Sequence, residues 1–226
     1  MANVVKTAYD LYKKDIISGI LFSLAITVMG LLFVIPVIGA IIYSFVFPRL
    51  LVWYYQKLSG EKLNPNYKVS FISIFIPSLI LSIGIFLLLL VLIFGIFSYG
   101  LGGTINSSYI LNTQYLYNQN IFSTYLGILS IVIIFIGIVI YLFSLYSFYG
   151  SLFGKVDKYK LDLWNSIEIF VYYLSIGLIV SVIFDIIDAL FSLASPIAGF
   201  IIGLIFLILF GIEIQYLVPM VVMKNL

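Results

Sequence analysis

The chain has 226 residues, of which 64% are hydrophobic and 9% are charged, and its formal net charge is +2. In soluble domains roughly a quarter of all residues are charged, so this composition excludes a water-soluble globular protein. Because a membrane-spanning helix takes roughly 20 apolar residues, the chain has room for about six spans joined by short loops. It contains no Cys, no His and no basic run, so we expect no metal site, no cofactor and no nucleic-acid partner.

The N-terminal segment 3–15 has the pattern of an amphipathic helix. One face carries Val4, Val5, Ala8, Leu11 and Tyr12, and the opposite face carries Lys6, Asp10, Lys13 and Lys14. We expect this helix either to lie in the headgroup plane with its lysines toward the cytoplasm, or to form a polar lead-in to the first span.

Residues 16–55 form an apolar run that is too long for one span and suits two. Pro36 and Gly39 lie at its middle. Pro disfavours helix in the residue before it and Gly tolerates turn conformations, which predicts spans at about 16–35 and 38–56. Arg49 then lies in the second half of the second span, from where its side chain can extend to the cytoplasmic surface.

Four further spans are predicted at about 71–97, 122–149, 166–191 and 197–222. Residues 98–121, between the third span and the fourth, carry no charge. The last turn contains Pro196 and Gly199 and repeats the Pro-x-x-Gly-x-Ile-Ile pattern of residues 36–42. Ile is abundant enough for this match to arise by chance, so a duplication of the hairpin stays open.

The lysines support this assignment because they all fall on one side of the membrane. They are Lys6, Lys13, Lys14, Lys57, Lys62, Lys68, Lys155, Lys158, Lys160 and Lys224. The positive-inside rule makes this side cytoplasmic. We therefore predict an all-α polytopic membrane helical bundle, with six transmembrane helices in three hairpins and an N-terminal amphipathic helix. It is a single integral membrane domain over residues 1–226, in the cell membrane, with both termini cytoplasmic.

The stretch from Tyr43 to Phe71 combines an aromatic-rich helix end, the polar sequence from Lys57 to Lys62, an Asn-Pro pair and Ser70-Phe71. In these features it resembles uncharacterised six-helix integral membrane domain families of archaea and bacteria. These families include the membrane domain beside some glycerophosphodiester phosphodiesterases. The resemblance implies an integral membrane protein of unknown function and supplies no catalytic residues.

Asp185 and Asp188 are spaced i, i+3, so on a helix they share one face in the outer half of the fifth span. A carboxylate in hydrocarbon costs roughly 2.5–3.5 kcal/mol on insertion scales, and such groups usually face the bundle interior or water. The pair is a candidate proton or cation site. The structural alternative is that Asp188 reaches surface water and Asp185 bonds a Tyr or Ser of another helix.

Glu213 lies in the inner half of the sixth span, at a depth similar to that of Arg49. We predict an ion pair that fixes the second span against the sixth, with a place in a transport path as the alternative. Gly199 and Gly203 form a GxxxG pattern that lets another helix approach the sixth span, within the bundle or in a homo-oligomer. A glycosylation sequon at Asn106 lies in the predicted outer loop.

Three classes of function remain. A membrane-embedded subunit or scaffold that packs against partner proteins fits the short loops and the lack of a catalytic constellation. The alternative is a small transporter or channel for protons or cations that uses Asp185, Asp188 and Glu213. An intramembrane enzyme ranks third because no His-, Cys- or Ser-based arrangement is present. We therefore predict no catalytic residues and no enzyme activity.

Overall fold

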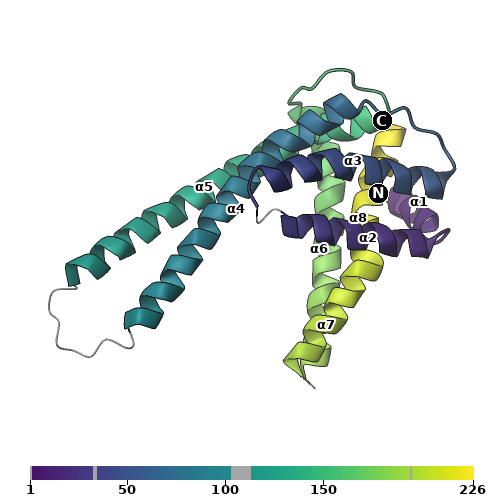
Figure 1. Ribbon diagram of the computed structural model, residues 1–226. Helices are drawn as coiled ribbons and strands as arrows, with labels where there is room; N and C mark the ends of the chain where they lie inside the picture. Colours follow the sequence, from purple (N-terminus) through teal and green to yellow (C-terminus); the bar gives the residue numbers. More distant parts are fainter. Residues whose placement is uncertain (1, 33–34, 103–112, 194) are drawn as a thin grey trace.

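The computed structural model describes residues 2–32, 35–102, 113–193 and 195–226, and these residues form helices with no strand among them (Figure 1). The helices are α1 (Ala2–Tyr12), α2 (Ile16–Leu31), α3 (Ile38–Ser59), α4 (Tyr67–Gly102), α5 (Thr113–Leu152), α6 (Leu163–Ser192), α7 (Pro196–Phe206) and α8 (Ile212–Asn225). A π-helical turn, η3 (Leu207–Gly211), separates α7 from α8. The prediction of an all-α fold is confirmed.

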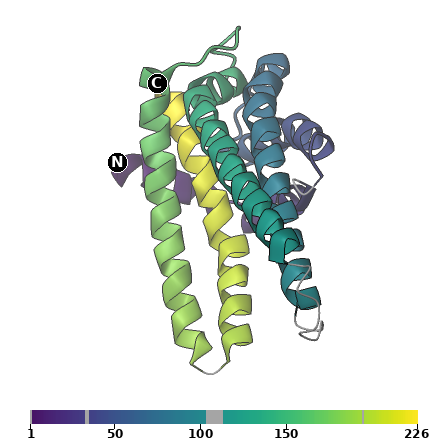
Figure 2. The ribbon, with the colours of Figure 1, turned by 90° about the vertical axis from the view of Figure 1, so that its left-hand side faces the viewer.

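The helices after α1 form three hairpins: α2 with α3, α4 with α5, and α6 with the arm made of α7 and α8. The connections at residues 57–68 and 153–162 lie close to both termini of the chain. We call this end of the molecule the base. In Figure 1, α2 and α3 run across the page, α6 and α7 run down it, and α4 and α5 run obliquely. Figure 2 shows α6 beside the arm of α7 and α8. The hairpins therefore diverge from a common base.

Five helices in the described chain are long and apolar enough to cross a membrane, or six if α1 and α2 count as one bent span. With 16 residues, α2 covers about 24 Å, less than the roughly 30 Å of bilayer hydrocarbon. It meets α1 at an angle of 97°. The helix observed in place of the predicted span at 16–35 is therefore shorter than expected, and α1 does not continue it in a straight line. Instead α1 packs on α8 and buries Ala8, Leu11 and Tyr12.

The core lies near the base, where aromatic side chains of α2, α5 and α8 pack on those of α3. Half of the most apolar stretch of α3 is buried (50%), against 11% for α5 and for α6. The largest fully buried aromatic residues are Tyr12, Phe22, Phe47, Tyr54, Tyr55, Phe148 and Tyr149. In the part of the chain that the structure describes, the buried polar side chains are serines, with Glu213 the exception. Serine suits this position because a small side chain lets helices approach closely.

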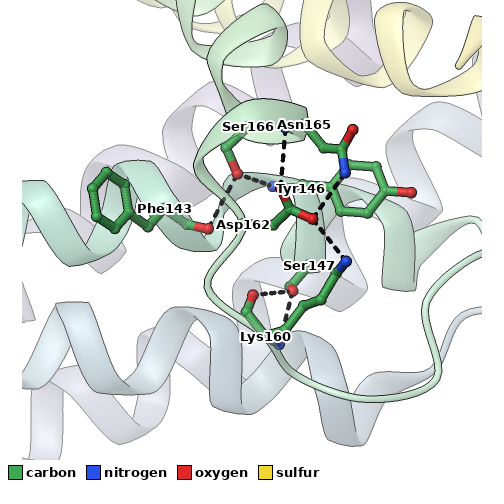
Figure 3. Close-up of polar contacts among 7 residues, drawn as sticks. All are labelled: Phe143, Tyr146, Ser147, Lys160, Asp162, Asn165 and Ser166. Carbon is green, nitrogen blue, oxygen red and sulfur yellow. Dashed lines mark hydrogen bonds and ion pairs between the residues drawn. The ribbon is translucent and has the colours of Figure 1, made fainter.

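A polar network at the base holds the start of α6 on α5 (Figure 3). The Asp162 carboxylate accepts the Asn165 N–H and pairs with the Lys160 ammonium at 2.7 Å, so it caps α6. The Asp162 N–H and the Ser166 hydroxyl both donate to the Phe143 carbonyl of α5. These bonds connect the beginning of one hairpin to the end of another.

Ion pairs join other parts of the base. Asp15 caps α2 by accepting the Ser18 N–H and hydroxyl, and it pairs with Lys57 of α3 at 3.0 Å. Lys224, at the end of α8, pairs with Glu61 in the connection between α3 and α4. The predicted gathering of charge at one end of the hairpins is thus present in the structure, and part of that charge holds the helix ends together.

The two Pro-x-x-Gly turns place their glycines inside the returning helix, not in the turn. Gly39 and Gly199 donate their N–H groups to the residues that precede the prolines, Ile35 at 2.9 Å and Ser195 at 3.0 Å. The positive φ of the first turn falls on Val37, at 66°. The prediction that Gly39 supplies the turn conformation is therefore wrong. A branched residue takes it, which is a strained arrangement.

The predicted outer loop at 98–121 is shorter in the structure. Residues 98–102 belong to α4 and residues 113–121 belong to α5. The rest of the loop, with the sequon at Asn106, lies outside the described residues.

Candidate functional site

Glu213 is the most unusual side chain in the described core. It lies in the first turn of α8, directly after the π-helical turn, and is 0% exposed. Neither of its carboxylate oxygens has a hydrogen-bond partner. A buried carboxyl without a partner has lost its hydration with no compensating bond. Such groups are rare in folded proteins, so Glu213 is the first candidate for a functional role.

Helices α2 and α3 pack around the Glu213 carboxyl. A Cβ added to Gly19 would lie 3.1 Å from Glu213 Cγ and equally close to the Tyr54 hydroxyl and a Tyr12 ring carbon. The Ser23 hydroxyl, one turn after Gly19, lies beside the carboxyl. It is not in hydrogen-bond geometry there, and the buried Tyr54 hydroxyl is unpaired too. Unpartnered oxygens of three helices therefore converge on one point of the core.

The π-helical turn sets the direction in which Glu213 points. A π turn contains one extra residue, which rotates the following side chains by about 100° relative to a continuous α-helix. The Tyr12 hydroxyl of α1 donates to the Leu209 carbonyl inside this turn, at 2.6 Å. The turn is thus fastened to α1, and π turns of this kind are frequent at functional sites.

The structure does not join Arg49 to Glu213, which corrects the predicted ion pair. The Arg49 guanidinium lies over the rings of Phe45 at 3.7 Å and Tyr67 at 4.7 Å, and it donates to the Phe45 carbonyl. The prediction rested on positions along the two helices and left out the direction around each helix. Arg49 and Tyr54 are five residues apart and so point about 140° apart on α3. Tyr54 faces Glu213, so Arg49 faces α4.

The outer aspartates have different surroundings although they share a helix. Asp188 is half-buried and accepts the Ser192 hydroxyl at 3.2 Å. A Cβ at Gly199 would lie 2.7 Å from the Asp188 carboxylate, so this glycine lets the two helices meet at the hairpin tip. Asp185 is exposed on the outward face of α6. The candidate pair is therefore split into one packed and one open carboxylate.

The predicted GxxxG glycines pack inside the last hairpin. Gly203 lies against the Phe184 ring of α6, whose nearest atom would be 2.7 Å from an added Cβ, and Gly199 meets Asp188. Both contacts bring α7 close to α6. Neither glycine faces outward, since each one is buried.

Sequence reasoning found Glu213 but missed its neighbours. Gly19 and Ser23 form a small-xxx-small pattern in α2, a signal that could have marked this face as a close packing surface. No group of three or more Asp or Glu residues placed to hold a metal ion occurs among the described residues. Comparison of the chain with protein-family models, with curated proteins and with solved structures finds no match.

Proposed function

We propose that the protein is a membrane-embedded subunit that packs against a helix of a partner membrane protein through the outward face of α6. One observation supports this proposal above others. Asp185 is exposed on α6, and exposed apolar side chains lie on both sides of it along the helix. Ser181, one turn before Asp185, and Ala189, one turn after it, are exposed as well. We call Ser181, Asp185 and Ala189 the α6 stripe.

The physical basis lies in what drives helices together in lipid. Apolar side chains gain little by leaving lipid for protein, so close contact between small residues and hydrogen bonds between polar groups drive association. Ser181 and Ala189 permit close approach, and a carboxylate facing lipid costs roughly 2.5–3.5 kcal/mol at the helix centre on insertion scales. A partner donor that reaches Asp185 would remove part of this cost.

The rest of α6 offers a natural comparison. Ile179, Ile186 and Leu190 are also exposed, but they project from a neighbouring face and are bulky and apolar. They suit contact with lipid chains. In Figure 2, α6 lies along one side of the molecule, with the N-terminal helix passing behind it.

The orientation that accompanies this proposal has the base in the cytoplasm and the hairpin tips on the outer side of the cell membrane. The support is the gathering of lysines at the base and the positive-inside rule. The resemblance to six-helix prokaryotic membrane domains fits the same setting.

The test uses the absence of Cys from the chain, which makes every introduced Cys unique. Ser181→Cys and Ala189→Cys probe the stripe, and Ile179→Cys and Leu190→Cys are matched controls on the same helix. In native membranes, a thiol-attached photo-crosslinker should give a discrete adduct from the stripe positions, and mass spectrometry would identify the adduct as a second copy or another protein. Equal labelling at stripe and control positions would overturn the proposal.

A second candidate function, a small proton or cation transporter, has one observation in its favour, the unpartnered Glu213 carboxyl. The outer aspartates do not strengthen it, because Asp188 is engaged by Ser192 and Asp185 faces outward. Flux measurements in vesicles would test it. Unchanged flux in a Glu213→Gln variant would count against this role.

A further inference from the structure

We propose that Glu213, Ser23 and Tyr54 form a site that holds one positive charge in the core, carried by a proton or by a small monovalent metal ion. The site lies where α2, α3 and α8 meet. It does not depend on the assembly proposed for α6, which concerns another face of the molecule.

The burial of Glu213 requires such a charge. An isolated carboxylate in a low-dielectric interior is so unfavourable that it takes up a proton, pairs with a cation or is not found there. The cationic side chains of α3 and α8 are engaged elsewhere: Lys57 pairs with Asp15, Lys224 pairs with Glu61, and Arg49 lies over two aromatic rings. Within the described chain, no protein cation bonds to Glu213.

The neighbouring groups can bind a proton or cation but supply no charge of their own. Tyr12 of α1 and Tyr54 of α3 are the titratable side chains that face Glu213, and Ser23 faces it from α2. Phenol and serine hydroxyls are neutral at pH 7 and can act as donors or acceptors. The Tyr12 hydroxyl is already used, since it donates to Leu209. Ser23 and Tyr54 are left to coordinate a metal ion or to share the proton of a carboxylic acid.

Helix α2 covers the site from one side. Gly19 and Ser23 face the carboxyl, while Leu21, Leu24 and Val28 of the same helix are exposed. A single helix thickness therefore separates the site from the surroundings. The Phe22 ring stacks on Tyr54 at 4.5 Å between ring centres and shields the site within the core.

The experiment uses the full chain in lipid nanodiscs and distinguishes the two carriers. The chain contains three glutamates, Glu61, Glu168 and Glu213. Carboxyl-labelled glutamate therefore restricts the infrared signal to these residues. For a proton, we expect at neutral pH a labelled carboxylic-acid band that is absent from Glu213→Gln and retained in Glu168→Gln. For a metal ion, we expect the melting temperature to rise with sodium but not with choline, and this rise to be lost in Glu213→Gln.

Two further variants keep the test decisive if Glu213→Gln does not fold. Tyr54→Phe and Ser23→Ala each remove one hydroxyl and leave the carboxyl in place. Under the proposal, they shift the carboxylic-acid band or weaken the sodium effect. A labelled spectrum with every glutamate ionised at neutral pH, together with no effect of sodium on the melting temperature, would overturn the proposal.

Discussion

Glu213 of α8 and Gly19 of α2 meet so closely in the core that a Cβ at Gly19 would lie 3.1 Å from Glu213 Cγ. The same Cβ would crowd Tyr12 and Tyr54 at the same distance. The absence of a side chain at Gly19 therefore lets α2 cover the carboxyl. Four helices, α1, α2, α3 and α8, therefore pack together at this contact.

The first prediction concerns Gly19→Ala, with Gly30→Ala in the same helix as its control. An alanine gains up to about 1 kcal/mol over glycine within a helix, and Gly30 has nothing within 4 Å of an added Cβ. Gly30→Ala should therefore raise the unfolding free energy by up to about 1 kcal/mol. Gly19→Ala should lower it by about 1–2 kcal/mol, because overpacking outweighs the helix preference. Denaturation in detergent measures both, and equal stability of the two variants would show that the contact is looser than described.

The second prediction concerns the pair that sequence reasoning expected, Arg49 and Glu213. If they formed an ion pair, Arg49→Leu alone would destabilise the protein more than the double replacement with Glu213→Gln. Since Arg49 lies on Phe45 and Tyr67 instead, we expect the two single effects to add within about 0.5 kcal/mol. Unfolding free energies of the two single variants and the double variant give the coupling. A coupling energy well above this value would show that Arg49 and Glu213 do form an ion pair.

The failure of that ion pair illustrates what the sequence can and cannot predict here. Helices and hairpins follow from the lengths of apolar runs and from Pro36 and Pro196, which are local signals, and they were predicted closely. The position of Glu213 along its helix was also accessible by counting residues. The side of each helix that faces its neighbours was not, because membrane helices are apolar on every side and carry little amphipathic signal.

The divergence of the hairpins and the π-helical turn were also inaccessible. No residue type marks a π turn, yet the extra residue in Leu207–Gly211 changes the direction in which Glu213 points. At the steep bend between α1 and α2, Tyr12 bonds to Leu209 in the π-helical turn, a contact between residues far apart in the chain. Of the candidate site, Glu213 was predictable, but Ser23 and Tyr54 required the structure.

The third prediction concerns acid stability and the two helix caps at the base. Hydrogen bonds from Ser18 and then the pairing with Lys57 lower the pKa of Asp15 from 3.8 to about 2. Lys160 and then Asn165 lower the pKa of Asp162 from 3.8 to about 2. A carboxyl whose pKa is lower in the folded state stabilises the fold above its unfolded pKa. This stabilisation is therefore present above about pH 4 and is lost as the pH falls toward about 2.

Melting temperatures measured between pH 6 and pH 2 would check this. The double variant with Asp15→Asn and Asp162→Asn should be less stable than the wild-type protein at pH 6, and the difference should shrink toward pH 2. A difference that stays constant over this range would mean that other carboxyls govern the acid response. Asp157→Asn, at an exposed position of the same base, is the matched control and should lower the melting temperature at pH 6 by less than the double variant does.

The last prediction concerns strain in the turn between α2 and α3, where Val37 has a φ of 66°. With a ψ of −61°, this residue is at the centre of a γ-turn, closed by the Ile38 N–H donating to the Pro36 carbonyl at 2.7 Å, and such strained backbone costs an L-residue roughly 1–3 kcal/mol. Val37 is 47% exposed, so its removal sacrifices little packing. Val37→Gly should therefore raise the unfolding free energy by about 1 kcal/mol. Val28→Gly, at an exposed helical position of α2, should instead lower it by roughly 0.3–0.5 kcal/mol, because glycine is a poorer helix former than valine. The two variants should change the unfolding free energy in opposite directions, because only Val37 has a strained backbone. If both lose stability to the same degree, Val37 is not strained.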